Sequence, residues 1–198
     1  MLRKHFYPMI EPRLNQAAEI LHRQGFTPNQ LTLAGLAINF LAGCIYATGA
    51  FFLGGLVLII ASLADMLDGP LARLTGKSTP FGAFLDSTVD RYSDFFAFAG
   101  LTLFFARENQ GGWLLISLGI LLGAFVTSYA KARAESMIES CPVGLFERPE
   151  RVIIFAVGSI IWPLMPICLW ILLVGTHWTA LERIFYTQKK LSENANPE

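Results

Sequence analysis

The sequence predicts an all-α integral membrane protein, built as a bundle of six transmembrane helices with an N-terminal amphipathic helix at the membrane interface. Composition and the grouping of apolar residues predict this class. Hydrophobic residues make up 54% of the chain and charged residues only 15%, whereas soluble proteins average about 25% charged residues. The apolar residues gather in runs close to the ~20 residues that a helix needs to cross a bilayer. In lipid such runs must be helical, because every backbone polar group needs a partner in its own segment or in a closed barrel.

Residues 1–30 are expected to form the interfacial helix and the approach to the first span. Leu14, Ala17, Ala18 and Leu21 share one face at helical spacing, with charged residues around them. Such a helix is suited to lie in the plane of the membrane surface. A helix on the surface of a soluble domain is the alternative interpretation. No apolar core run interrupts these charges, so the segment does not resemble a cleaved signal peptide.

The six predicted spans follow one another with mostly short connections, which predicts a single domain over residues 1–198. A longer polar loop separates the fourth and fifth spans, and a Pro-rich turn at 163–166 separates the fifth and sixth. The core covers residues 31–188, and residues 189–198 are expected to be a flexible tail. In chain order, the spans are expected at 31–48, 51–74, 81–105, 113–134, 152–162 with Arg148 as the earliest start, and 164–185.

The distribution of basic residues predicts the orientation of the bundle. Six spans place both termini on the same side, and every Lys and Arg except Arg107 falls on or near that side. The positive-inside rule therefore predicts a multi-pass protein of the inner, cytoplasmic membrane with both termini and the charged helix ends in the cytoplasm. The formal net charge is zero, which argues against a nucleic-acid partner.

Five carboxylates lie inside the second and third predicted spans. Each charge placed within the membrane costs several kcal/mol, roughly 2.5–3.5 on insertion scales. Five such charges need compensation, and a bound cation is the simplest source of it. The residues concerned are Asp65, Asp68, Asp86, Asp90 and Asp94.

The spacing of four of these residues supports a shared metal ion. Asp65 and Asp68 are three residues apart, and Asp86 and Asp90 are four apart, so each pair lies on one face of its helix. The two helices are consecutive and antiparallel, and both pairs lie toward the same membrane side. All four aspartates are therefore predicted metal ligands, and a purely carboxylate set suits a hard ion such as Mg²⁺ or Mn²⁺.

Intramembrane carboxylates also occur in cation transporters, which are a competing class. A transporter commonly carries such groups near the midplane, on broken helices in repeated halves. Here they cluster toward one end of two adjacent helices, and the sequence shows no repeat. A non-catalytic membrane scaffold is a third class, but it has no need for the aspartates.

The stretch from Asp65 to Asp90 also carries a family resemblance. It follows the pattern DxxDGxxAR, eight residues, GxxxDxxxD, which resembles the signature of the CDP-alcohol phosphotransferase family at every fixed position. The resemblance implies a membrane enzyme that transfers a phosphatidyl-type group from a CDP-linked lipid to a small alcohol. It further implies that Asp65, Asp68 and Asp86 mainly bind metal, and that Asp90 is the general base that takes the proton from the acceptor hydroxyl.

The same resemblance implies contacts to the CDP-lipid donor. Gly69 and Arg73 would hold the CDP portion, and Ala72 would leave room for it. The start of the first span also resembles the family, which adds Asn29 and Thr32 as contacts to the nucleotide end of the donor. A Pro placed after a capping residue is equally what local rules require of a helix start, so capping alone also explains this segment.

A second cluster of basic residues points to an anionic acceptor. The segments SYAKARAE (128–135) and GLFERPERV (144–152) resemble those of prokaryotic phosphatidylinositol-phosphate synthases and their archaeal ether-lipid counterparts. Carried over, Lys131, Arg151 and Arg183 would bind the phosphate of inositol phosphate. Glycerol 3-phosphate is the alternative acceptor, because it is also a small phosphorylated alcohol and the cationic cluster alone does not decide between the two.

Two further expectations concern packing. Asp94 lies one turn after Asp90, outside the signature, and is expected to pair with Arg91 or to orient a ligand. The resemblance implies a homodimer. Small residues in the second and third spans allow the close helix contacts that a dimer or the bundle itself would use, and these are Gly54, Gly55, Ala97, Ala99 and Gly100.

Overall fold

The computed structural model describes the backbone of residues 2–76 and 78–195 and the side chains of residues 10–76 and 78–193. Within these residues every regular element is a helix, which confirms the all-α prediction. In chain order the elements are α1 (Leu2–Arg23), α2 (Pro28–Ala47), α3 (Phe51–Leu74), α4 (Pro80–Arg107), α5 (Gly111–Ala134), α6 (Arg148–Ile160), the short 3₁₀ helix η1 (Trp162–Leu164) and α7 (Met165–Ala195).

A helix occupies each predicted span, but the last two differ in length. The helix α6 begins at Arg148, the earliest start that the sequence allowed, and has 13 residues. The helix α7 continues to Ala195, so residues 189–195, which were expected to belong to a flexible tail, are helical. Ion pairs of Lys189 and Lys190 with Glu193 stabilise this last part of the helix. Residues 196–198 lie outside the described part of the chain.

Among the described residues, four helical segments are long and apolar enough to cross a membrane, namely Pro28–Ala47, Phe51–Leu74, Gly111–Ala134 and Trp162–Glu193. The helix α4 has 28 residues, so it is long enough, but its first half carries too many charges. The helix α6 spans only ~20 Å at 1.5 Å per residue, less than the ~30 Å of a bilayer core. Length and composition therefore support four of the six predicted spans.

Helices α2 and α4, near the predicted site, both begin with a Thr cap followed by a Pro. Thr27 caps α2 in a capping box with Gln30, and Pro28 takes the first helical position. Thr79 caps α4, where its hydroxyl accepts a hydrogen bond from the Gly82 amide at 3.0 Å. Each cap satisfies an amide that a helix start leaves without a partner. The predicted helix start at residues 27–28 is confirmed.

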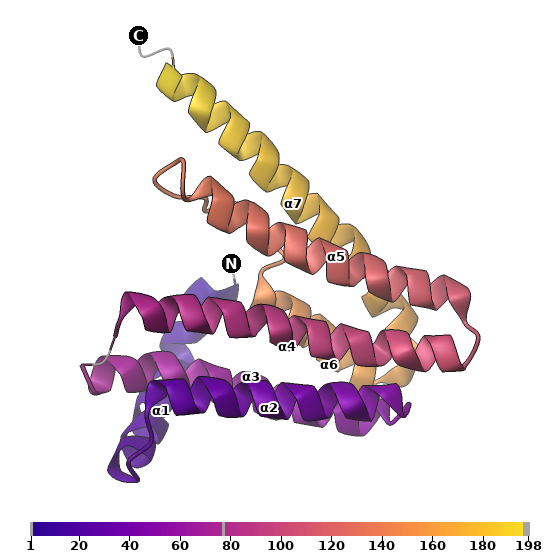
Figure 1. Cartoon of the computed structure of the whole chain (residues 1–198), viewed down its shortest axis with the longest axis horizontal. Helices are drawn as coiled ribbons and strands as arrows, with labels where there is room; N and C mark the ends of the chain where they lie inside the picture. Colours follow the sequence, from indigo (N-terminus) through magenta and orange to yellow (C-terminus); the bar gives the residue numbers. More distant parts are fainter. Residues whose placement is uncertain (1, 77, 196–198) are drawn as a thin grey trace.

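The helices lie side by side in a bundle (Figure 1). Helix α2 contacts both α3 and α4, α5 contacts α4 and α7, and α6 packs against α3 and α7. Aromatic rings fill the centre: the Phe155 ring of α6 stacks on Tyr46 of α2 and on Phe98 of α4, each with ring centroids 4.8 Å apart. The Tyr46 hydroxyl lies 2.8 Å from the Ser159 hydroxyl, so this buried polar group is satisfied.

Helix α1 runs across one end of the bundle, at a steep angle to α2 (Figure 1). Its predicted apolar face packs on the protein, because Ala18 and Leu21 cluster with Leu31 of α2 and Leu71 of α3. The same end of the molecule carries the connection between α3 and α4, and the connections from α2 to α3 and from α4 to α5 lie at the other end.

Small residues bring the helices into close contact within the chain. A Cβ atom added to Gly100 of α4 would lie 2.1 Å from the carbonyl oxygen of Gly43 on α2. A Cβ atom on Gly55 of α3 would lie 2.9 Å from the Ser159 Cβ of α6. These glycines are therefore needed for packing inside one bundle, where backbones approach each other directly.

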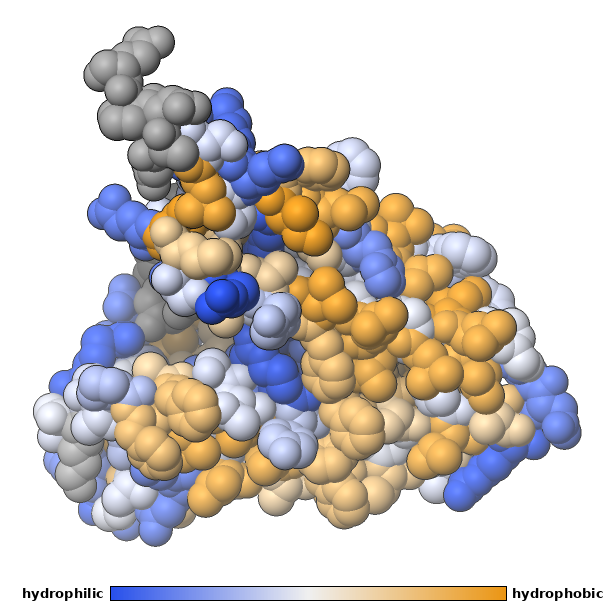
Figure 2. All heavy atoms as spheres, turned by 45° about the horizontal axis from the view of Figure 1, so that its top comes forward, coloured by the Kyte–Doolittle hydropathy of each residue, from blue (hydrophilic) through white to orange (hydrophobic). Residues whose placement is uncertain are grey.

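The outer surface is hydrophobic over much of the bundle. Figure 2 shows hydrophobic side chains across the middle of the visible face, with hydrophilic ones gathered toward its ends. Large apolar side chains are exposed on several helices, among them Phe40 of α2, Leu122 of α5 and Trp178 of α7. An exposed apolar belt of this extent is what lipid contact requires.

Candidate metal and substrate site

The predicted aspartates of α3 and α4 come together at one end of the bundle. Asp65 and Asp68 project from α3, and Asp86 and Asp90 from α4. Asp86 lies close enough to interact electrostatically with each of the other three. The aspartate pair of α3 and the aspartate pair of α4 therefore lie close together, as the sequence predicted.

A guanidinium group lies among these carboxylates. Arg148, the first residue of α6, donates from Nη2 to Asp65 Oδ2 at 2.7 Å and pairs through Nη1 with Asp90 Oδ1 at 2.6 Å. It thus bridges α3 and α4, which a metal ion was expected to bridge. Arg148 is mostly buried, with 19% of its side chain exposed, so its charge is held in a setting where it attracts the carboxylates strongly.

The carboxylates fit a hard divalent ion by chemistry but are not arranged around one. Among the described residues, no group of three or more His, Cys, Asp or Glu side chains could hold a metal ion as arranged, so the predicted four-carboxylate cage is not formed in this structure. Asp65 Oδ1 is buried without a hydrogen-bond partner, which is costly for a carboxylate. Five aspartates also outnumber the arginines paired with them, so negative charge is left over for a cation.

Helix α2 supplies support for two of the aspartates. The Thr32 hydroxyl lies 2.9 Å from Asp68 Oδ2 and 3.1 Å from the carbonyl oxygen of Pro28. Gly35, one turn later, leaves space for Asp65, because a Cβ atom there would lie 2.1 Å from Asp65 Oδ1. Thr32 therefore orients an aspartate, a role that the sequence did not predict. Asn29 is exposed on the first turn of α2.

The predicted donor-binding residues lie on the exposed end of α3. Arg73 is exposed in the last turn, and Ala72 is half-buried beside it. A Cβ atom on Gly69 would meet only the tip of Arg73, at 3.7 Å, so no other part of the protein crowds this glycine. Pro70 follows inside the helix, and it removes the amide that would bond to the carbonyl of Met66. This end of α3 therefore leaves room for a ligand beside Gly69.

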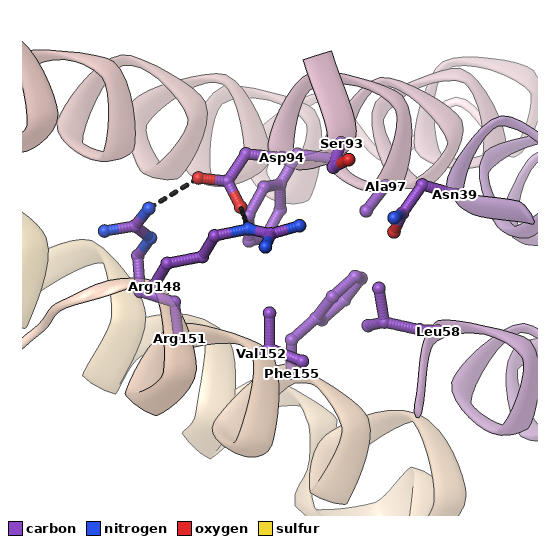
Figure 3. A pocket seen from close by; sticks show the side chains of 10 residues that line it. Asn39, Leu58, Ser93, Asp94, Ala97, Arg148, Arg151, Val152 and Phe155 are labelled. Carbon is purple, nitrogen blue, oxygen red and sulfur yellow. Dashed lines mark hydrogen bonds and ion pairs between the residues drawn. The ribbon is translucent and has the colours of Figure 1, made fainter. Parts of the chain in front are cut away.

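Asp94 pairs with α6 and not with Arg91, so that part of the prediction is wrong. Its Oδ2 accepts a hydrogen bond from Arg151 Nη2 at 2.5 Å, and its Oδ1 lies 3.9 Å from Arg148 Nε. Figure 3 shows both arginines reaching from α6 toward Asp94. The Arg91 guanidinium instead bonds to the carbonyl of Ser87 on its own helix. Asp94 thereby links Arg148, which pairs with the predicted metal ligands, to Arg151, which is a predicted acceptor-binding residue.

A small cavity of about 10 Å³ lies behind these arginines, lined also by Asn39, Ser93 and Phe155. It has room for about one water molecule. A nucleotide or a sugar phosphate is far too large for it, so these ligands need the more open side of the aspartate cluster.

The other two predicted acceptor residues meet at a glutamate. Lys131 Nζ donates to Glu147 Oε1 at 2.8 Å, and Arg183 Nη2 donates to the same oxygen at 3.2 Å. Arg183 also donates to the carbonyl oxygens of Val143 and Thr127. Burial raises the pKa of Glu147, but the hydrogen bond and charge of Lys131 and the charge of Arg183 outweigh it, so this pKa lies below its ordinary value. Glu147 is therefore ionised at neutral pH.

The loop between α5 and α6 fixes the position of Glu147. Phe146 packs on α7 at Gly175, where a Cβ atom would lie 2.3 Å from the ring. The Phe146 amide donates to the Thr179 hydroxyl at 3.1 Å, and its carbonyl accepts from Arg151 Nη1 at 3.1 Å. Gly144 has a φ of +109° and passes close to Arg183. The loop is thus held against α7 directly beside the basic residues.

Sequence reasoning identified most of this site but missed two roles. Lys131, Arg151 and Arg183 were expected to converge, and Arg151 lies close enough to Arg183 to interact with it electrostatically. Arg148 and Glu147 were noted only as part of the basic segment, and neither was assigned to a site. Charge balance was the signal in the sequence that pointed to these two roles, since buried carboxylates and buried cations both need partners within the chain.

Comparison with protein-family models gives one match. The model of the family CDP-alcohol phosphatidyltransferase matches residues 26–181 of this chain. The matched segment runs from just before α2 into α7, so it includes the five aspartates, Lys131, Arg148 and Arg151, whereas Arg183 lies two residues beyond its end.

Characterised relatives and solved structures match over most of their length. The phosphatidylinositol phosphate synthase of Mycobacteroides abscessus is 39% identical over 180 residues, covering 86% of this chain and 81% of that protein. The archaetidylinositol phosphate synthase of Pyrococcus horikoshii is 33% identical over 187 residues, covering 93% and 95%. Crystal structures of the Mycobacterium tuberculosis phosphatidylinositol phosphate synthase are 34% identical. The form with CDP-DAG bound superposes with a TM-score of 0.82 over 88% of this chain and 92% of that chain. The form with manganese and citrate gives 0.83 over 88% of both.

Proposed function

Because this chain belongs to the CDP-alcohol phosphatidyltransferase family and is therefore a transferase, we propose that it transfers a phosphatidyl or archaetidyl group from a CDP-linked lipid to inositol phosphate and releases CMP. One observation carries the proposal beyond the family. Lys131 of α5 and Arg183 of α7 converge on a single anionic oxygen, beside the arginines that contact the aspartates. Such a pair of cations is suited to the phosphate of an acceptor.

The aspartates divide into metal-holding and proton-accepting roles. Asp65, Asp68 and Asp86, with Asp90, would hold a Mg²⁺ or Mn²⁺ ion. When bound, the ion offsets the charge of the donor diphosphate. Asp90 accepts the proton of the acceptor hydroxyl. The acceptor oxygen then forms a bond to the lipid-bearing phosphorus while the bond from that phosphorus to CMP breaks.

The exposed end of α3 binds the donor. Arg73, exposed in the last turn, pairs with the diphosphate, and Gly69 and Ala72 let the nucleotide approach the helix backbone. Asn29, which is exposed on the first turn of α2, and Thr32 contact the nucleotide end of the donor. Thr32 already contacts Asp68, so a donor held there lies next to the metal ligands.

Lys131, Arg151 and Arg183 bind the acceptor phosphate. Inositol phosphate is favoured over glycerol 3-phosphate because the relatives from Mycobacteroides abscessus and Pyrococcus horikoshii, 39% and 33% identical, are named phosphatidylinositol and archaetidylinositol phosphate synthase. The basic residues themselves suit either acceptor, since both carry a phosphate. The two acceptors are therefore distinguished by experiment.

We further propose how the bundle sits in the membrane. The four apolar spans are completed by α4 and α6, whose charges face the interior of the bundle at Arg148, Asp90 and Asp94. Helix α1 runs across the end of the bundle that carries the site. We place it at the membrane interface there. This end faces the cytoplasm of the inner membrane, and two copies form a homodimer within the bilayer.

An acceptor screen tests the proposed function. Purified protein with CDP-diacylglycerol and Mg²⁺ or Mn²⁺ is offered inositol 1-phosphate, glycerol 3-phosphate, free inositol or serine, and CMP release is measured. We expect release with inositol 1-phosphate at a kcat/KM at least about tenfold above that with free inositol or serine, since a missing charge-assisted contact costs about 1.5–3 kcal/mol. It should also exceed release with glycerol 3-phosphate, in line with the names of the relatives. If glycerol 3-phosphate is the preferred acceptor, it takes the place of inositol phosphate in the proposed reaction. If free inositol is preferred, Lys131, Arg151 and Arg183 do not bind an acceptor phosphate.

Replacing Lys131 with Ala tests the acceptor site residue by residue. We expect the KM for the phosphorylated acceptor to rise by about tenfold or more, because a charge-assisted hydrogen bond is lost, while the KM for CDP-diacylglycerol changes little. Arg133→Ala is the matched control. Arg133 lies on the same helix end but is exposed and contacts Ser136. Equal effects of the two substitutions would show that general surface charge, and not a defined site, attracts the acceptor.

A further inference from the structure

The glutamate at the start of α6 occupies the position that an acceptor phosphate needs. Glu147 Oε1 lies 2.8 Å from Lys131 Nζ and 3.2 Å from Arg183 Nη2. These are the distances and the donor types by which a phosphate oxygen is bound. As long as Glu147 stays there, both cations are already neutralised, and an incoming phosphate has to compete with a carboxylate of the protein itself.

The surroundings allow the carboxylate to leave while the cations stay. Arg183 is buried and tied to the carbonyl oxygens of Val143 and Thr127, so its position does not depend on Glu147. The Glu147 and Lys131 side chains are 31% and 37% exposed, so both can be reached from outside. The backbone before Glu147 is held through Phe146 on α7, and side-chain rotation alone can move the carboxylate.

A spare donor lies on Arg151, which is close enough to Arg183 to interact with it electrostatically. Arg151 uses Nη1 on the Phe146 carbonyl and Nη2 on Asp94, and its Nε is buried without a hydrogen-bond partner among the described residues. A buried N–H without a partner is costly, and an acceptor anion bound beside it can supply the missing oxygen.

We propose that Glu147 is an internal counter-anion that fills the acceptor-phosphate subsite in the ligand-free protein and must swing out before a phosphorylated acceptor binds. This inference rests on the proposed function, because it takes Lys131 and Arg183 as the phosphate-binding residues. Glu147 is in this sense a specificity-determining residue. Neutral acceptors cannot displace it, whereas a doubly charged phosphate can, so it selects for strongly anionic acceptors.

The test compares phosphate affinity in the wild type and in Glu147→Gln, with inorganic phosphate as the probe and calorimetry on the purified full-length protein as the readout. Glutamine keeps the shape but removes the competing charge. We expect phosphate to bind about tenfold more tightly to the variant, the gain from one charge-assisted contact that no longer has to be displaced. Glu139→Gln, an exposed position in the same loop, is the matched control and should leave the affinity unchanged.

Unchanged or weaker phosphate binding in Glu147→Gln overturns the inference, because an orienting glutamate would have helped the cations to bind. If the Gln variant does not fold, Glu147→Asp keeps the charge but withdraws it by one methylene, and phosphate should then bind about threefold more tightly. Binding of phosphate is measured without turnover, so the result is independent of the acceptor screen. Failure of that screen removes the proposed function, whereas failure here removes only the role of Glu147.

Discussion

Replacing Asp90 with Asn is expected to lower CMP release by about 10²–10⁴-fold, the range that a positioned general base contributes. Asn has the same shape, and its amide oxygen can still contact the Arg148 guanidinium that pairs with Asp90. The variant should therefore fold and keep its contacts to α6, but it cannot take a proton from the acceptor hydroxyl. Steady-state CMP release with CDP-diacylglycerol and the preferred acceptor is the measurement.

Two controls decide how the Asp90 result is interpreted. Size-exclusion elution of Asp90→Asn should match that of the wild type, and its melting temperature should stay close to the wild-type value because Arg148 keeps its pairs with Asp65 and Asp94. These two measurements separate loss of chemistry from loss of fold. Glu139→Gln is the same chemical change at an exposed loop position, and its turnover should be unchanged. A folded Asp90→Asn protein with wild-type turnover would rule out Asp90 as the base.

Replacing Arg148 with Gln is expected to make Mn²⁺ binding about tenfold tighter, because the guanidinium and the ion compete for Asp65 and Asp90. In EDTA the variant should be less stable than the wild type, since removing one partner of a buried charge pair costs about 3–5 kcal/mol. Addition of Mn²⁺ should then raise its melting temperature more than that of the wild type. Calorimetric Mn²⁺ titration and thermal unfolding with and without Mn²⁺ are the measurements.

Arg91→Gln is the matched control for this experiment. Arg91 also lies near Asp90, but at 3.9 Å and with 38% of its side chain exposed, so its loss should change Mn²⁺ affinity little. If Arg148→Gln binds Mn²⁺ no better than the wild type, then Arg148 does not compete with the ion, and its contacts to the aspartates persist in the metal-bound state.

Most of the helical layout followed from hydrophobic runs and helix-start signals. The segments of α2, α3 and α5 are long and mostly apolar, so the length of their apolar runs indicated spans. The prediction of helix bounds was weakest where charged residues interrupt or follow the hydrophobic run. Helix α6 has only 13 residues and begins in the charged segment at Arg148, and α7 extends past its apolar part through charged residues that pair along the helix. Local ion pairs can prolong a helix without leaving any hydrophobic pattern to detect.

The site was predictable in its residues but less so in its contacts. Spacing placed Asp65 with Asp68 and Asp86 with Asp90, because residues three or four apart share a helix face. It could not place Arg148 among them, since that contact joins residues 83 positions apart. The partner of Asp94 was misassigned for the same reason: Arg91 is near in sequence, whereas Arg151 is near in space. Contacts between distant helices depend on how the helices pack, and helix periodicity does not specify that.

A structure of the protein with bound Mn²⁺, with the ion located by anomalous scattering, tests the central claim most directly. We expect the ion between α3 and α4, with oxygens of Asp65, Asp68 and Asp86 at about 2.0–2.6 Å and the Arg148 guanidinium moved out from between Asp65 and Asp90. An ion bound elsewhere, or a saturated protein in which Arg148 still bridges the two helices, would contradict the shared carboxylate site on which the proposed transfer reaction depends.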